Sequence, residues 1–217
     1  MKYELAIFDL DGTILDTLDD LTDAVNAALA ASHFPARTRE EVRGFVGNGI
    51  RLLIERAVPS GTNTAQIDTV FAHFKKYYAA HCADRTAPYA GVRELLQMLR
   101  AAGWRVAVLS NKADFAVQTL CARYFDGLLD AAAGERAGVL RKPAPDGVWA
   151  LLSSLKVSRE RAVYIGDSEV DVQTAQNAGL DAILVDWGFR TAAQLSAAGA
   201  TRIVSDTKAL ADCILLV

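Results

Sequence analysis

The chain has 217 residues and a formal net charge of −3, with acidic and basic residues interspersed. This length suits one α/β domain or two smaller ones, and the balanced charge argues against a nucleic-acid-binding protein. No apolar run reaches the ~18 residues that indicate a transmembrane helix. The cysteines are few, odd in number and scattered, which predicts free thiols in a reducing cytoplasm: Cys82, Cys121 and Cys213.

A short apolar run at residues 5–8 predicts a buried strand, and two carboxylates, Asp9 and Asp11, leave its end. Gly12 stops the strand, because glycine marks a turn or a close backbone approach. Open α/β sheets bind their ligands at the carboxyl ends of their strands. Two carboxylates this close repel each other unless a cation or a proton lies between them. The pair is therefore a candidate metal and reaction site, and a plain Asp-rich turn is the alternative.

Residues 16–84 show helical periodicity and no strand pattern. They predict helices that begin at Thr17, at Thr38, after the loop 44–49, and at Thr64. Thr17 and Thr64 are expected to act as N-caps, and Thr38 opens a sequence of the capping-box type. This helical insert starts directly behind the carboxylate pair, where a lid would shield a reaction from water.

Beyond residue 88, strands and helices alternate, as in a parallel α/β sheet. The expected fold is α/β, with a Rossmann-like three-layer core formed by residues 1–15 and 85–217 and a small all-helical cap domain formed by residues 16–84. The strands are expected at 105–109, 128–132, 162–165, 182–185 and 202–204, and the helices between them at 92–102, around Phe115–Leu120, from Pro145 to Leu155, up to Gly179, and at 191–198.

Polar side chains stand at several of these strand ends. Ser110 follows the strand at 105–109, Lys142 precedes a helix, and Asp167 and Asp171 follow the strand at 162–165. The carboxyl ends of parallel strands share one edge, so these groups are expected to converge with the first carboxylate pair. Carboxylates suit Mg²⁺, and Mg²⁺ with a lysine ammonium binds phosphoryl oxygens. One aspartate can attack phosphorus and another can transfer the proton.

Taken in order, these segments resemble the four motifs of the haloacid dehalogenase (HAD) phosphatase superfamily. The segments are Asp9-Leu10-Asp11-Gly12-Thr13, Ser110, Lys142-Pro143 and Gly166-Asp167-Ser168-x-x-Asp171. The helical insert lies where that family carries its C1-type cap. Within the superfamily the chain is similar to phosphoglycolate phosphatases, through the loop Phe45-Val46-Gly47-Asn48-Gly49 and the segment Lys142-Pro143-Ala144-Pro145.

The resemblance implies a division of roles among the aspartates. Asp9 is the expected nucleophile and a Mg²⁺ ligand. Asp11 is the expected general acid and base, and it binds Mg²⁺ through its backbone carbonyl. Asp167 completes the metal site, and Asp171 either lies behind the metal or anchors Lys142. The division fits the chemistry, because metal contact keeps a nucleophile ionised while a general acid must hold a proton.

Substrate-binding roles are implied for both parts of the chain. Ser110 and Lys142 are expected to hold the phosphoryl group, with Asn111 as a further donor. In the cap, a loop precedes a helix whose free N–H groups suit a substrate carboxylate, and the candidates there are Arg43, Gly47, Asn48 and Gly49. The alternative is a plain turn between helices, flanked by the surface arginines Arg43 and Arg51. Arg190 either reaches the edge of the site or faces solvent.

The predicted function is that of a Mg²⁺-dependent phosphomonoester hydrolase that acts on a small phosphorylated metabolite through an aspartyl-phosphate, most closely a phosphoglycolate phosphatase. A phosphosugar mutase of the β-phosphoglucomutase type, a pyrophosphatase or a nucleotidase would use the same motifs. A receiver-like phosphorylation switch also places Asp, Ser or Thr and Lys at strand ends, but it lacks an inserted cap. No membrane or nucleic-acid partner is expected, and the sequence leaves a monomer and a homodimer open.

Overall fold

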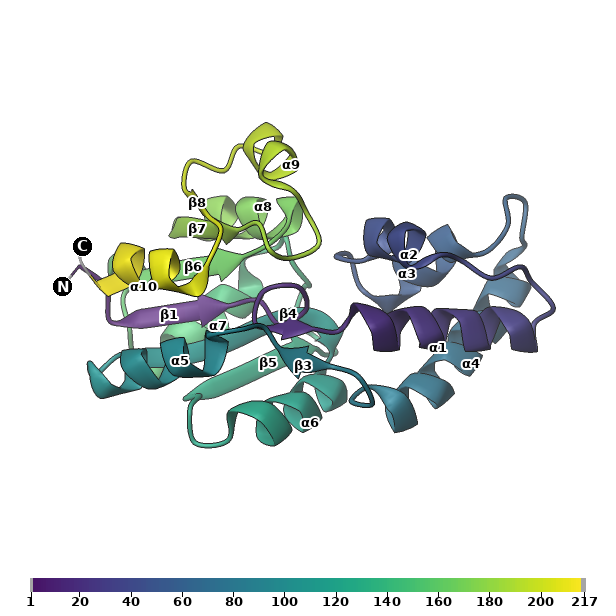
Figure 1. Cartoon of the computed structure of the whole chain (residues 1–217), viewed down its shortest axis with the longest axis horizontal. Helices are drawn as coiled ribbons and strands as arrows, with labels where there is room; N and C mark the ends of the chain where they lie inside the picture. The colour runs from purple at the N-terminus through teal and green to yellow at the C-terminus, as the bar shows by residue number, and fades with distance from the viewer. Residues whose placement is uncertain (1, 216–217) are drawn as a thin grey trace.

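The computed structural model describes residues 2–215 of the chain (Figure 1). Within this range a six-stranded sheet has the order β5-β4-β1-β6-β7-β8, and neighbouring strands run parallel. The predicted α/β fold with a parallel sheet is confirmed. The strands are β1 (Leu5–Phe8), β4 (Arg105–Ala113), β5 (Ala131–Glu135), β6 (Ala162–Gly166), β7 (Asp181–Val185) and β8 (Ile203–Val204).

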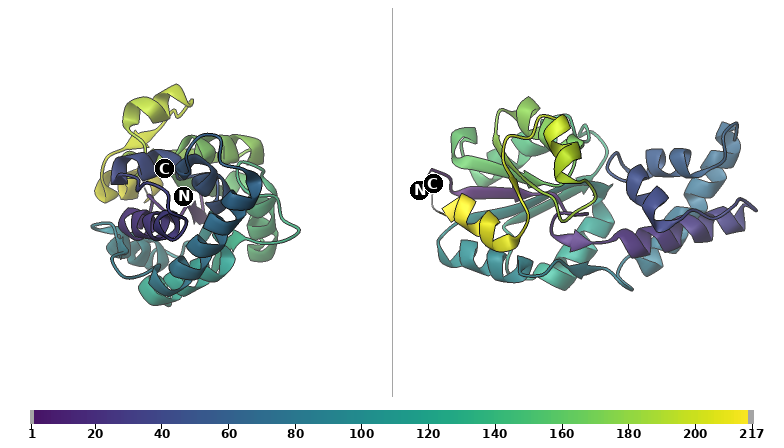
Figure 2. Two further views of the ribbon diagram at one scale, coloured as in Figure 1. Left: turned by 90° about the vertical axis from the view of Figure 1, so that its right-hand side faces the viewer. Right: turned by 45° about the horizontal axis from the view of Figure 1, so that its top comes forward.

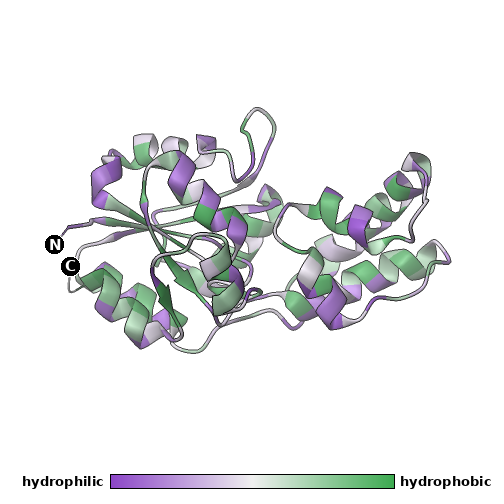
Figure 3. Cartoon of the chain, turned by 90° about the horizontal axis from the view of Figure 1, so that it is seen from above, coloured by the Kyte–Doolittle hydropathy of each residue, from purple (hydrophilic) through white to green (hydrophobic). Residues whose placement is uncertain are grey.

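Helices cover both faces of this sheet and make it the middle of three layers. Side chains alternate across β1, so Ala6 and Phe8 enter one hydrophobic cluster, and Leu5 and Ile7 enter the other. Figure 3 shows the mostly apolar strands between the amphipathic helices. The first cluster includes α5 (Val92–Ala101), α6 (Asp114–Phe125) and α10 (Thr207–Leu215), and the second includes α7 (Asp146–Leu155) and α8 (Glu169–Ala178). The helix α9 (Ala192–Ala197) packs beside α8, and a 3₁₀ turn, Arg159–Arg161, leads into β6.

A separate helical lobe, called the cap from here on, extends from one end of the sheet (Figures 1 and 2). It consists of α1 (Leu18–Ala31), α2 (Arg39–Phe45), α3 (Ile50–Ala57) and α4 (Thr64–His81). A small antiparallel pair of strands, β2 (Leu15–Asp16) with β3 (Ala87–Pro88), joins the lobes. This pair was not expected, because Asp16 was assigned to the helical insert. The division of the chain into domains at residues 15/16 and 84/85 stays a prediction.

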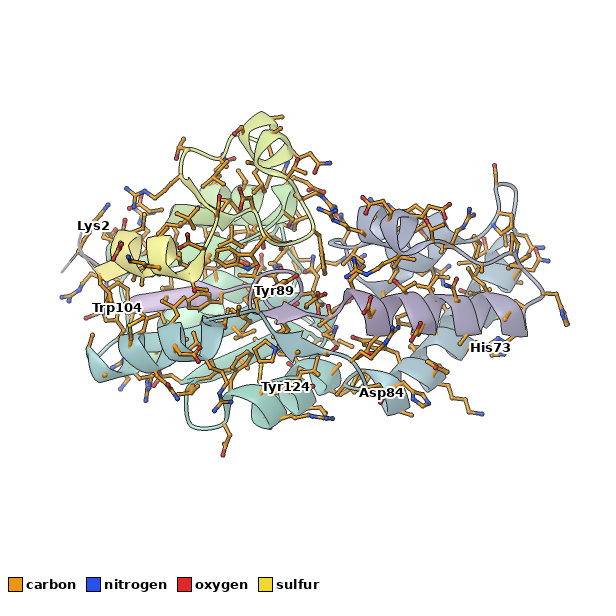
Figure 4. All side chains as sticks on the ribbon, in the orientation of Figure 1. Lys2, His73, Asp84, Tyr89, Trp104 and Tyr124 are labelled. Atoms are coloured by element: carbon orange, nitrogen blue, oxygen red, sulfur yellow. The ribbon has the colours of Figure 1, made fainter. Side chains whose placement is uncertain are left out.

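The two segments that connect the lobes are tied together by a buried aspartate. The Asp20 carboxylate, at the start of α1, accepts hydrogen bonds from the backbone N–H of Arg85 and of Thr86 and from the Thr86 hydroxyl at 2.7 Å. Tyr124 of α6, which is labelled in Figure 4, donates its hydroxyl hydrogen to the Thr86 carbonyl at 2.6 Å. The outgoing and returning segments are therefore tied to each other and to α6 where the cap meets the core.

Several local predictions need correction. Asn63, and not Thr64, caps α4, because its side chain accepts from Gln66 N and completes a capping box. Thr17 stands at the N-cap position of α1, but its side chain makes no cap hydrogen bond. The strand expected at 128–132 begins at Ala131, after a turn in which Gly127 has a φ of +73°.

Other local predictions fit the structure. The capping box at Thr38 is present, and Gly179 ends α8 in the left-handed conformation. The helix α10, which follows the last strand, was not expected. Within residues 2–215, no helix is long and apolar enough to cross a bilayer. The thiols of Cys82, Cys121 and Cys213 are all free.

Candidate active site

The first carboxylate pair follows the central strand of the sheet. Asp9 N donates to the Ile165 carbonyl at 2.8 Å, so the chain leaves β1 alongside β6. The turn then closes at Gly12, which has a φ of +86°. A Cβ atom at this position would lie 2.2 Å from Asp167 Oδ2. Only glycine therefore lets the turn press against Asp167.

A buried lysine bridges two of the aspartates. Lys142 Nζ lies 2.8 Å from Asp9 Oδ1 and 2.8 Å from Asp171 Oδ1. Burial alone would lower the pKa of Lys142, but Asp171 and Asp9 outweigh burial and raise that pKa well above its usual value. The ammonium is therefore charged, and it has a third N–H for another acceptor. The predicted convergence of Lys142 with the strand-end aspartates is what the structure shows.

Asp171 is held on all sides by donors of this protein. Besides Lys142, its carboxylate accepts from the Ser168 hydroxyl at 2.6 Å, from the backbone N–H of Ser168 and of Asp167, and from the Tyr164 hydroxyl at 3.2 Å. A carboxylate offers about four lone-pair sites, so little capacity remains for a metal. Of its two expected roles, the geometry favours the anchor for Lys142.

Asp9 and Asp167 fit a divalent cation. Oxygens of Asp9, Asp167 and Asp171 lie within 4.8 Å of one another, and all three residues are buried. Asp167 accepts from the Phe189 N–H at 2.7 Å and from the Thr13 hydroxyl at 3.3 Å, which leaves it lone pairs to spare. Burial, together with the neighbouring carboxylates, raises the pKa of Asp167 well above its usual value. An oxygen-binding cation such as Mg²⁺ would relieve this repulsion.

The buried carboxylates give the metal-free protein a defined pH dependence. Burial raises the pKa of Asp9 from 3.8 to about 7, against the opposing effect of Lys142. The folded state therefore retains a proton that the unfolded state has lost, so the free energy of unfolding falls as pH rises through this window. We expect unfolding in EDTA to show this fall between pH 4 and about 7, and Asp9→Asn to show less of it. Equal slopes for both proteins would contradict the assignment.

The candidate phosphate ligands line one cavity. Its volume is about 50 Å³, and its walls include Asp9, Asp11, Ser110, Lys142 and Asp167. By this measure a single water needs roughly 10–15 Å³, so the cavity admits only a small ligand.

Asn111 also borders this cavity, but its amide is already committed. Its Nδ2 donates to the Lys142 carbonyl at 3.0 Å and to the Gly47 carbonyl at 3.2 Å. A side-chain amide has two N–H groups. In this structure the Asn111 side chain therefore positions Lys142 and the cap, and the expected role of Asn111 as a donor to phosphate stays a prediction.

The segment 43–49 consists of the end of α2 and the loop after it, and it is called the cap loop from here on. Only some of its predicted substrate-binding residues line the cavity. Gly47 and Gly49 line the wall, whereas Asn48 and Arg43 do not. Arg43 turns toward the core backbone, where its Nε donates to the Phe189 carbonyl at 2.9 Å. Arg51 pairs on the cap surface with Glu55 and Asp68.

Three core side chains hold the cap loop by its backbone carbonyls. Arg190 Nη1 donates to the Arg43 carbonyl at 3.2 Å, and its Nη2 donates to the Val46 carbonyl at 3.0 Å. Arg141 donates to the Asn48 carbonyl, and Asn111 donates to that of Gly47. Arg190 is 8 % exposed and is fixed by Glu169 at 2.8 Å. Of its two predicted positions, Arg190 occupies the edge of the site.

Sequence reasoning missed Lys112 and Tyr78. Lys112 Nζ lies 2.8 Å from Asp11 Oδ1 and 3.1 Å from Oδ2, and its side chain is 2 % exposed. Burial alone would lower the pKa of Lys112, but Asp11 and Tyr78 outweigh it and raise that pKa. The sequence held no signal for Lys112, because the strand was expected to end at residue 109, whereas β4 continues to Ala113 with an irregular register after Leu109. Tyr78 gave no signal either, since it belongs to an ordinary apolar helix stripe.

Comparisons with known proteins agree with this geometry. A family model described as haloacid dehalogenase-like hydrolase matches residues 6–185. A phosphoglycolate phosphatase of Mesorhizobium japonicum is 33% identical over 195 residues, which are 87% of this chain and 85% of that protein. A phosphoglycolate phosphatase of Cereibacter sphaeroides is 36% identical, with 86% of each chain covered.

Solved structures show the same fold. A protein of Lactobacillus delbrueckii subsp. bulgaricus, provisionally named a phosphoglycolate phosphatase, superposes with a TM-score of 0.94 at 40% identity over 99% of both chains. CbbY of Rhodobacter sphaeroides, solved with bound phosphate, superposes with a TM-score of 0.76 at 27% identity over 96% of both chains.

Proposed function

Since this chain belongs to the haloacid dehalogenase-like hydrolases and is a phosphatase, we propose that it hydrolyses 2-phosphoglycolate with Mg²⁺ through an aspartyl-phosphate on Asp9. The observation that carries the proposal is the bridge from Lys142 Nζ to Asp9 and Asp171 in the wall of the cavity. It supports the proposal because a carboxylate that attacks a phosphate dianion needs a fixed cation beside it.

In the first step a carboxylate oxygen of Asp9 attacks phosphorus, and the bond from phosphorus to the ester oxygen breaks. Asp11 gives its proton to that leaving oxygen. Lys142, through its third N–H, and the Ser110 hydroxyl hold the oxygens of the transferring group. In the second step Asp11 takes a proton from water as the water oxygen attacks phosphorus, and Asp9 leaves as a free carboxylate. The products are the alcohol and inorganic phosphate.

Asp9 and Asp167 would hold Mg²⁺, with the Asp11 carbonyl as the further ligand that the family resemblance implies. The ion supplies positive charge to the phosphoryl oxygens and keeps Asp9 ionised. This chain's own contribution is to exclude water and fix orientation. The cap loop closes over the cavity, and Asp171 holds Lys142 against Asp9. We also propose that the enzyme acts in the cytoplasm, in keeping with its free thiols.

A panel of phosphate esters tests the proposal. Phosphate release with Mg²⁺ is measured for 2-phosphoglycolate, glucose 1-phosphate, glucose 6-phosphate, a nucleoside monophosphate and pyrophosphate. We expect kcat/KM for 2-phosphoglycolate to exceed the others by at least about tenfold, which is ~1.4 kcal/mol of transition-state preference. EDTA should abolish the activity. Interconversion of the two glucose phosphates without phosphate release would instead identify a mutase.

A further inference from the structure

Two buried hydrogen-bond donors stand beside Asp11, and one of them lacks an acceptor among the described residues. The Tyr78 hydroxyl belongs to a side chain that is 1 % exposed, and it has no hydrogen-bond partner within residues 2–215. Lys112 Nζ lies 4.8 Å from the centre of the Tyr78 ring and donates to both oxygens of Asp11. Asp11 takes two of the three N–H groups of this ammonium, and the Tyr78 hydroxyl lies within reach of the third, so the two donors form one cluster. Both residues line the cavity.

The cap side chains that line the cavity together with Tyr78 offer no acceptor. The neighbouring lining residues from the cap are the apolar Leu21, Ile50 and Leu53. A buried donor without an acceptor costs free energy, and native structures leave few of them. The missing acceptor is therefore expected to arrive with a ligand. A lysine ammonium beside a tyrosine hydroxyl suits an anionic oxygen.

The position of these donors fixes which part of a substrate they meet. A general acid works within about 2.6–3.2 Å of the oxygen that it protonates, so the ester oxygen lies next to Asp11. Lys112 Nζ donates a hydrogen bond to the same Asp11 carboxylate, at 2.8 Å from Oδ1. A group attached one or two carbons beyond the ester oxygen therefore comes within reach of Lys112 and Tyr78.

We propose that Lys112 and Tyr78 form a subsite for a carboxylate carried next to the ester oxygen, so that the substrates are short phosphorylated hydroxy acids. This inference rests on the proposed function, because that function places the ester oxygen at Asp11. A lysine shared by two carboxylates already occurs in this protein, since Lys142 contacts Asp9 and Asp171 at 2.8 Å each. Lys112 would serve Asp11 and the substrate in the same way. The carboxylate thus binds between β4 and α4, and not at the cap-loop N–H groups.

Tyr78→Phe tests the subsite without disturbing packing, because it removes only the hydroxyl. Phosphate release is compared for 2-phosphoglycolate and for ethyl phosphate, which has the same skeleton but no carboxylate. We expect kcat/KM to fall about 10- to 100-fold for 2-phosphoglycolate, as for the loss of a hydrogen bond to a charged group, and to stay within about twofold for ethyl phosphate. Tyr77→Phe, a neighbour on α4 outside the cavity wall, is the matched control.

Lys112→Met is the second variant. It should lower activity on both substrates, because Asp11 loses its partner, and the loss should be at least about tenfold larger for 2-phosphoglycolate. An equal loss on both substrates in Tyr78→Phe, or no loss on 2-phosphoglycolate, would overturn the subsite. Equal kcat/KM values of the wild-type enzyme for ethyl phosphate and 2-phosphoglycolate would also overturn the subsite, but they would leave the phosphatase assignment intact. A wild-type protein that releases phosphate from neither ester would refute the proposed function itself.

Discussion

Replacing Asp9 by Asn is expected to lower phosphate release by at least about 10⁴-fold, the scale on which removal of a nucleophile acts in other enzymes. The amide cannot attack phosphorus, so no acyl-phosphate forms. The fold should survive, because Asn is isosteric and removes a carboxylate whose burial opposes ionisation. Initial rates with 2-phosphoglycolate and Mg²⁺ measure the effect, and intact-protein mass spectrometry of quenched wild-type enzyme should detect a phosphorylated species that the variant lacks.

Asp126→Asn provides the control for this variant, because Asp126 is an exposed residue at the end of α6. It should retain wild-type rates and the phosphorylated species. Substantial turnover by Asp9→Asn would show that another group accepts the phosphoryl group. The covalent mechanism would then have to be abandoned even if the protein remained a phosphatase.

Replacing Lys142 by Met is expected to affect both stability and activity. The substitution leaves Asp9 and the fully buried Asp171 without their cation. Breaking a buried ion pair from one side typically costs about 3–5 kcal/mol of unfolding free energy. Urea unfolding of the metal-free protein measures this cost. Phosphate release should fall by about 10³-fold, because a fixed donor to the phosphoryl oxygens is lost.

A double variant separates the two effects. Lys142→Met with Asp171→Asn removes both ends of one pair, so its stability loss should be smaller than the sum of the single losses. Activity should not return, since the donor to the phosphoryl group is still missing. Lys208→Met, an exposed lysine on α10, is the control for loss of a positive charge. Strictly additive stability losses would show that Lys142 and Asp171 do not stabilise each other.

The core of the site could be predicted from the sequence because it depends on which residues follow each strand along the chain. Apolar runs mark the parallel strands, and the residues after them, such as Asp9, Asp167 and Ser110, must share one edge. Lys142 was predicted from its position before a helix and from its charge, although its loop lies between β5 and α7 and follows no strand end directly. Only the structure shows that it faces Asp9.

What the sequence could not provide is the direction of long side chains between lobes. Arg43 and Arg190 look alike as charges, yet Arg190 is almost fully buried against cap carbonyls and Arg43 reaches back to the core. In the sequence Tyr78 looks like one more apolar position of α4. Helical periodicity shows that its ring is buried, but it does not show that its hydroxyl lies near the active-site cavity. Asn111 was assigned to phosphate by its neighbour Ser110, but tertiary contacts use both of its amide hydrogens.

The way in which the core grips the cap loop has a consequence for how substrate preference can change. The acceptors at Arg43, Val46, Gly47 and Asn48 are all main-chain carbonyls, which every amino acid supplies. Side chains of this loop can therefore be exchanged without giving up the grip, provided the glycine conformations are kept. The main chain of this loop therefore holds the cap on the core, and its side chains remain free to determine substrate preference. A library that randomises position 46, which lines the cavity, should yield many folded variants from which new specificities can be selected.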